Sequence, residues 1–133
     1  MFENEIKAAE SVRNAEAELA TLDRQRYENL AKTTPFTHSL DHLRTIYKSS
    51  ASNGGKILKL VNNDLICTQP KKKCACFACG HHFLASEWTR AMASDEEIIV
   101  MCPACAVDAI LIDGDGYEIT DALVDDLHRL YFA

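Results

Sequence analysis

The fold is decided by Cys76-Phe77-Ala78-Cys79-Gly80 together with Cys102-Pro103-Ala104-Cys105, and twenty-two residues separate Cys79 from Cys102. A two-residue spacer lets both thiolates of one tight turn point at the same ion. Gly80 suits the position after such a turn because that residue needs a positive φ. Two such turns complete a tetrahedral shell of four sulfurs, an arrangement typical of zinc ribbons. We therefore predict one structural Zn²⁺ held by Cys76, Cys79, Cys102 and Cys105.

Other uses of these cysteines fit the pattern less well. A disulfide framework needs an oxidising compartment, and the first ten residues, MFENEIKAAE, lack the basic and apolar regions of a secretory signal. A redox CxxC needs one pair in a strand–helix context. An iron–sulfur cluster also takes four thiolates, but the glycine after the first pair favours zinc. Because a closed four-cysteine shell leaves no position for substrate, we expect a non-enzymatic protein.

Three residues near the first pair are candidate alternative ligands. Cys74 lies two residues before Cys76 and could replace it, pairing with Cys79 across a longer spacer. His81 and His82 directly follow the first pair and could each replace a thiolate. Since four cysteines already saturate the ion, we expect these residues to support the ligands or to lie on the surface.

The composition is that of a soluble globular protein. The chain has 133 residues, of which 47% are hydrophobic and 26% charged. No apolar run approaches the roughly 20 residues that a membrane span requires. We expect a cytoplasmic protein that has no membrane partner.

Charge is distributed unevenly along the chain. Residues 1–32 carry a net charge of −2, residues 33–73 carry +5, and residues 74–133 carry −9. An acidic whole argues against general binding of nucleic acid, which needs a concentrated positive field. The basic segment 48–73 is the alternative, a local nucleic-acid surface. Its candidate contacts are Lys56, Lys59, Lys71, Lys72 and Lys73.

The first thirty residues are predicted to form one long helix. Residues 3–31 contain no Gly or Pro and are rich in strong helix formers. At ~1.5 Å per residue the helix would be about 40 Å long, more than a small domain covers. Part of its apolar face is therefore expected to pack on a protein partner or on a second copy in a coiled-coil dimer. The alternative is a helix that folds back on its own domain. That face comprises Ile6, Val12, Leu19, Leu22 and Leu30.

The middle of the chain is predicted to be irregular. A short helix is expected over residues 39–48, followed by a Ser/Gly-rich linker at residues 49–55. After it, Asn62-Asn63-Asp64 between apolar runs favours a hairpin. The apolar residues of 57–65 also fit one face of a helix, so both structures are open at this stage.

The last third is predicted to hold the metal-binding domain. Strands are expected at residues 97–101 and 109–112, on either side of the second cysteine pair. Thr120 is a good N-cap for a final helix with an apolar stripe of leucines. The predicted architecture is α+β: a small antiparallel zinc ribbon with a long N-terminal and a C-terminal helix. Its segments are residues 1–34, 35–73 and 74–133.

Residues 74–133 contain a set of short motifs that is similar to the pattern of a known group of proteins. The set is C-x-C-F-x-C at 74–79, Ser86-Glu87, C-P-x-C at 102–105, Asp108, G-Y-E-I-T at 116–120, Leu127-His128 and Phe132. It resembles a group of small bacterial and phage cytoplasmic proteins treated as uncharacterised zinc-ribbon proteins. This chain has Ala106 where that group usually has glycine. The resemblance implies a zinc ribbon in the cytoplasm and implies no activity.

The predicted function is protein–protein interaction. A saturated metal site, an acidic head and an overlong helix suit a phage or bacterial regulator that binds and modulates a host protein complex. The alternative is a transcription-associated zinc ribbon that binds nucleic acid through residues 48–73.

Overall fold

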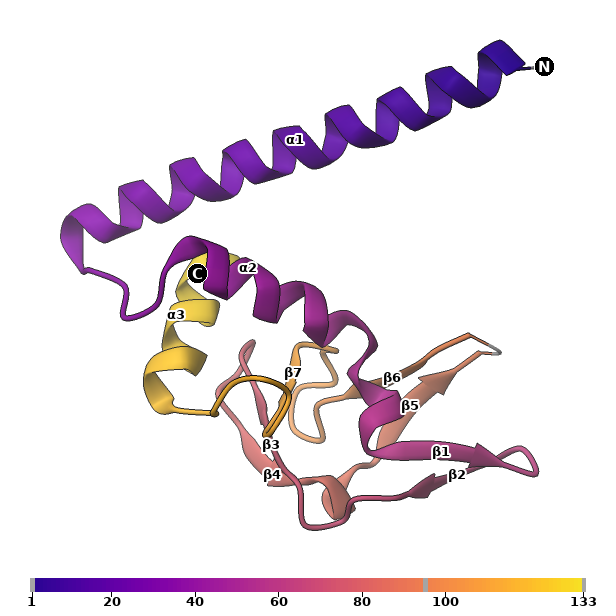
Figure 1. Cartoon of the computed structure of the whole chain (residues 1–133). Coiled ribbons are helices and arrows are strands. Elements are labelled where there is room, and N and C mark those ends of the chain that lie inside the picture. The colour runs from indigo at the N-terminus through magenta and orange to yellow at the C-terminus, as the bar shows by residue number, and fades with distance from the viewer. Residues whose placement is uncertain (1, 95, 133) are drawn as a thin grey trace. The chain divides into compact units, whose positions relative to one another are not determined.

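The fold is α+β, as predicted. A computed structural model describes residues 2–94 and 96–132, with side chains from Glu18 onward except Ser52. Its α-helices are α1 (Phe2–Thr33), α2 (Leu40–Ser49) and α3 (Asp121–Tyr131), and all strand pairs in the described residues are antiparallel (Figure 1). The chain divides into two units between Phe36 and Thr37. Within the described residues, no helix combines the length and the apolar character that crossing a membrane requires.

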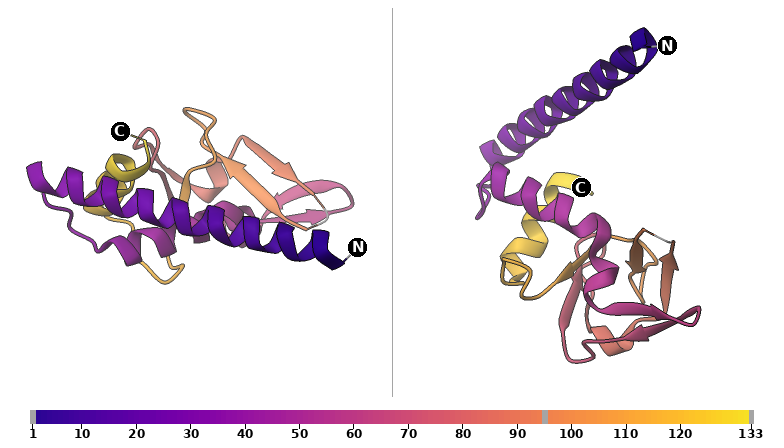
Figure 2. Two further views of the ribbon diagram at one scale, coloured as in Figure 1. Left: turned by 90° about the horizontal axis from the view of Figure 1, so that it is seen from above. Right: turned by 45° about the vertical axis from the view of Figure 1, so that its right-hand side comes forward.

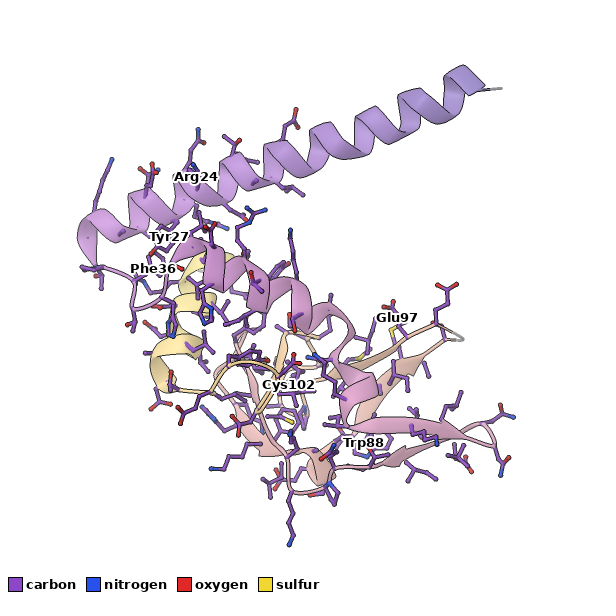
Figure 3. The ribbon with its side chains drawn as sticks, in the orientation of Figure 1. Arg24, Tyr27, Phe36, Trp88, Glu97 and Cys102 are labelled. Carbon is purple, nitrogen blue, oxygen red and sulfur yellow. The ribbon has the colours of Figure 1, made fainter. Side chains whose placement is uncertain are left out.

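The first unit is the single helix α1 and the residues that follow it. The helix ends at Thr33, two residues before Pro35, whose ring disfavours helical geometry in the preceding residue. The Tyr27 ring stacks on Phe36 with 4.3 Å between ring centroids, which holds the residue after Pro35 against the last turns of α1 (Figure 3). The predicted long helix is thus confirmed.

The predicted apolar face of α1 is seen only in part. Leu19 and Leu22 are 60% and 59% exposed, and Leu30 is half-buried. Ile6 and Val12 lie outside the residues whose side chains are described.

The second unit holds three small antiparallel sheets. A three-stranded sheet has the order β4-β3-β7, and β1 pairs with β2 and β5 with β6 in two separate ribbons. The strands are β1 (Leu58–Val61), β2 (Asp64–Cys67), β3 (Lys73–Cys76), β4 (His82–Leu84), β5 (Arg90–Ala93), β6 (Ile98–Met101) and β7 (Ile110–Ile112).

The segment with two open interpretations is a hairpin. Val61 pairs with Asp64 across a two-residue turn, and Asn62 and Asn63 have φ of 51° and 67°. Two consecutive positive φ angles define the turn that matches strand twist, and asparagine tolerates them well. The helical alternative was wrong because Asn62 and Asn63 favour a two-residue turn, and this turn decides between a hairpin and a helix.

The expected linker at 49–55 was wrong. Residues Ser50–Lys56 form a short 3₁₀ helix, η1, in which Asn53 is only 1% exposed. A Cβ on Gly54 would lie 2.3 Å from the backbone oxygen of Ile98 in β6. The glycine is therefore needed for close packing and does not mark a flexible link. Residues 37–73 accordingly belong to one unit with the cysteine-bearing part.

The core of the second unit lies between its two helices and the central sheet. Figure 2 shows α2 beside α3, and Tyr47 stacks on Tyr131 with 3.9 Å between ring centroids. Thr120 caps α3 by accepting a hydrogen bond from the Leu123 amide at 3.1 Å, as predicted. The largest buried apolar side chains include Leu43, Phe77, Ile110, Leu111, Ile112, Leu123, Leu127 and Leu130.

Candidate metal centre

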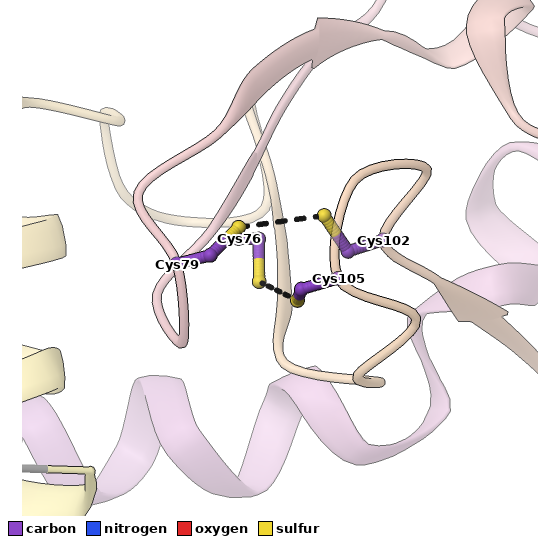
Figure 4. Close-up of side chains that lie close together, drawn as sticks. All are labelled: Cys76, Cys79, Cys102 and Cys105. Atoms are coloured by element: carbon purple, nitrogen blue, oxygen red, sulfur yellow. Dashed lines mark hydrogen bonds between the residues drawn. The ribbon is translucent and has the colours of Figure 1, made fainter.

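The four predicted cysteines come together in the second unit. Their sulfurs all lie within 4.8 Å of one another. The Cys79–Cys102 sulfurs are 3.6 Å apart and the Cys76–Cys105 sulfurs 3.7 Å apart (Figure 4). A tetrahedral shell with Zn–S bonds of ~2.3 Å has sulfur–sulfur edges of about 3.8 Å, whereas a disulfide bond measures about 2.05 Å. The thiols are free, and these two sulfur–sulfur distances match the edges of such a shell.

The first cysteine turn connects β3 to β4. Cys76 is the last residue of β3, and its carbonyl accepts a hydrogen bond from the Gly80 amide at 2.8 Å. The Cys76 amide donates to the His81 carbonyl at 2.9 Å, which closes the turn. Gly80 has φ of +82°, as its position in the motif predicts.

The second cysteine turn repeats this backbone pattern. Cys102 follows β6, its carbonyl accepts from the Ala106 amide at 2.9 Å, and its amide donates to the Val107 carbonyl at 2.8 Å. Ala106 has φ of +64°, a conformation that costs about 1–2 kcal/mol in a residue with a Cβ. Because this residue is an alanine and not a glycine, the sequence does not indicate that the second turn also has a positive φ.

The sheet aligns the two turns. Strand β7 begins five residues after Cys105 and pairs with β3, so that Ile110 lies opposite Cys76. The chain leaving the second turn is thereby hydrogen-bonded to the strand that enters the first. Two turns separated by more than twenty residues are held together by this pairing.

Burial and amide hydrogen bonds act in opposite directions on three thiols of the quartet. Burial raises the pKa of the Cys76 thiol, and burial also raises that of Cys79. At Cys102 burial opposes ionisation, but hydrogen bonds from the Cys105 and Ala104 amides outweigh it and lower the pKa. The Ala104 amide lies 3.3 Å from the Cys102 sulfur. A bound divalent ion would ionise all four thiols, and amide donors aimed at sulfur would stabilise their negative charge.

The alternative ligands lie outside the sulfur cluster. Among the described residues, no group of possible ligands that includes Cys74, His81 or His82 is gathered as closely as the four sulfurs. Cys74 is buried, its sulfur lies 3.7 Å from the Lys72 carbonyl, and burial, with Cys67 nearby, raises its pKa to about 12. The His81 backbone amide donates to the Cys79 sulfur, so His81 supports a ligand through its main chain.

The predicted basic segment is partly neutralised by an acidic turn. Lys56 forms an ion pair with Asp115. Partial burial opposes ionisation of Asp115, but the hydrogen bond from Lys56 outweighs it and lowers the carboxyl pKa. The Lys72 ammonium lies over Gly114, where an added Cβ would stand 2.9 Å from it. Among the five candidate lysines, the exposed ones are Lys59, Lys71 and Lys73.

Comparisons of the chain with protein families, with curated proteins and with solved structures gave no match.

Proposed function

We propose that the chain is a zinc-ribbon protein that acts as a non-enzymatic protein-interaction module. Its quartet of cysteines holds one structural Zn²⁺, which ties the first cysteine turn to the second. The observation that carries the proposal is the sulfur geometry, two cross-turn distances of 3.6 and 3.7 Å between matching turns. The resemblance of residues 74–133 supports a cytoplasmic phage or bacterial regulator that modulates a host protein complex.

Zinc suits the site better than other ions. Four thiolates in a tetrahedral arrangement are the usual shell of structural zinc, and iron is the other metal that such a shell takes. Four sulfurs fill the coordination sphere, so the ion would supply a crosslink and would leave no position for water or substrate. This supports a role in holding a binding surface in shape.

The partner surface proposed is α1. It is a 32-residue helix on which Leu19 and Leu22 are largely exposed. The second unit has its own buried core, in which apolar residues of α2, α3 and β7 take part. Burying a leucine is worth about 1.5–3 kcal/mol, so a leucine face repeated along a helix favours pairing with a second copy or another helix.

Elemental analysis of the full-length protein tests the metal. We expect one zinc per chain, retained in Cys67→Ser and lost in Cys102→Ser. Cys67 is the matched control because it is a free cysteine outside the sulfur quartet. A metal-free wild type, or one that holds iron, would contradict the zinc proposal.

Light scattering coupled to size exclusion tests the helix surface. The double variant Leu19→Glu/Leu22→Glu should lower the molar mass of a self-associating protein to that of the monomer. The matched control Thr21→Glu/Gln25→Glu adds the same charge to exposed positions of α1 and should leave association unchanged. A monomeric wild type would remove the homodimer and leave a different protein as the partner.

Nucleic acid is the second candidate, supported by the exposure of Lys59, Lys71 and Lys73. Binding of this kind weakens steeply with salt. Absence of a mobility shift with DNA or RNA at low salt would dispose of it.

A further inference from the structure

A pocket lies beside the first cysteine turn and borders the quartet, because Cys79 and Gly80 line part of it. Its volume is about 260 Å³, and its lining includes His82, Asp121, Asp125 and His128. These side chains come from two elements, strand β4 and helix α3. Two imidazoles and two carboxylates thus line one pocket, and both are side chains that bind transition ions in proteins.

The α3 residues share one face of the helix. Asp121, Asp125 and His128 are spaced by four and then three residues, which places their side chains along one side. Asp126, between them, is instead buried and accepts hydrogen bonds from the amide and ring of His38. The pocket is therefore lined by the exposed Asp121 and Asp125 of this helix and not by the buried Asp126.

Hydrogen bonding selects the ring nitrogen that His128 can offer. Its Nδ1 lies 3.0 Å from the Phe77 carbonyl oxygen. A carbonyl only accepts, so Nδ1 carries the proton and Nε2 of the neutral ring keeps its lone pair. A histidine that donates one ring N–H to a backbone carbonyl is the usual arrangement of a metal-binding histidine.

The pair formed by His82 and Asp121 shows a spacing that suits coordination. His82 Nε2 lies 3.7 Å from Asp121 Oδ1, which is too long for a hydrogen bond. Two donors at ~2.1 Å from one ion in tetrahedral geometry stand about 3.4 Å apart. His82 is half-exposed and Asp121 fully exposed, so small side-chain rotations can close this difference.

We propose that this pocket is a second metal site, which takes a divalent transition ion such as Zn²⁺, Co²⁺ or Ni²⁺ on His82, His128 and the carboxylate of Asp121 or Asp125. Imidazole nitrogens select these ions over Ca²⁺ and Mg²⁺, which prefer oxygen. Two carboxylates match the charge of the ion. Because the donors are less closely gathered than the four sulfurs, this site binds more weakly than the cysteine site.

Titration of the full-length protein with Co²⁺, after saturation with one equivalent of Zn²⁺, tests the site. Calorimetry should show one further equivalent of Co²⁺ bound. His82→Gln and the double variant Asp121→Asn/Asp125→Asn should each weaken this binding at least tenfold, and all three positions carry exposed side chains. The matched control is His81→Gln: this neighbouring ring is also exposed but stacks on Phe83 with 6.0 Å between ring centroids. It should bind Co²⁺ within twofold of the wild type.

Spectroscopy separates the two sites. Cobalt on nitrogen and oxygen lacks the intense thiolate-to-cobalt charge-transfer band, and it should broaden the ring proton signals of His82 and His128. Absence of a second equivalent would overturn the proposal. So would a charge-transfer band, which would place cobalt on the cysteines, or an equal loss of affinity in His81→Gln.

Discussion

Replacing Gly54 with alanine should unfold the second unit far more readily than the same change at Gly55. A Cβ at Gly54 would lie 2.3 Å from the Ile98 oxygen and 2.6 Å from the Ile98 carbonyl carbon. Ordinary contacts are 3.4 Å or more, so η1 and β6 would have to separate by about 1 Å. At Gly55 an added Cβ meets nothing within 4 Å.

The cost can be worked from the contacts that would move. Overpacking of this kind costs about 1–3 kcal/mol. The neighbouring Asn53 amide donates to the Ile110 carbonyl, and disturbing a buried hydrogen bond adds about 1–3 kcal/mol. We expect Gly54→Ala to lower the free energy of unfolding by about 3 kcal/mol, a fall in Tm of about 12–24 °C. Gly55→Ala should change it by less than about 1 kcal/mol.

Urea unfolding at fixed excess zinc measures the difference. Trp88 is the only tryptophan and lies half-buried in the second unit, so its fluorescence reports unfolding of that unit. The zinc concentration must be held constant because an ion that binds only the folded state adds to its stability. Unfolding free energies of the two variants that agree within about 0.5 kcal/mol would refute the packing argument.

Further predictions concern the cysteine turns and two buried groups. Ala106→Gly should raise the free energy of unfolding by about 1 kcal/mol, and Gly80→Ala should lower it by a similar amount, since both positions have positive φ. In the same urea assay, changes of equal sign in the two variants would contradict this. Because the pKa of Cys74 is about 12, only about one thiol in ten thousand is ionised at pH 8, and mass spectrometry should find it unmodified after iodoacetamide treatment of the folded protein. Asp126→Ala should cost about 2 kcal/mol in urea unfolding because it removes the buried carboxylate that accepts from the His38 amide and ring. An unchanged midpoint would argue against this bond.

The sequence determined the features that depend on neighbouring residues. The length of α1, the cap at Thr120 and the hairpin turn at Asn62-Asn63 follow from local propensities, which act within a few residues. The two CxxC pairs belong to the same class, because the spacer fixes the shape of each turn. Their spacing also predicted which four cysteines come together.

Only the tertiary structure decided the features that depend on contacts between distant segments. Composition marked residues 49–55 as a linker, but the approach of Ile98 made Gly54 a packing position. The acidic turn at Asp115 engaged Lys56, and α3 brought His128 to the same pocket as His82. Local periodicity cannot predict these contacts between distant residues, because their separation in the chain exceeds the length of any turn or helix repeat. Their energies arise only when the core has formed and excluded water around them.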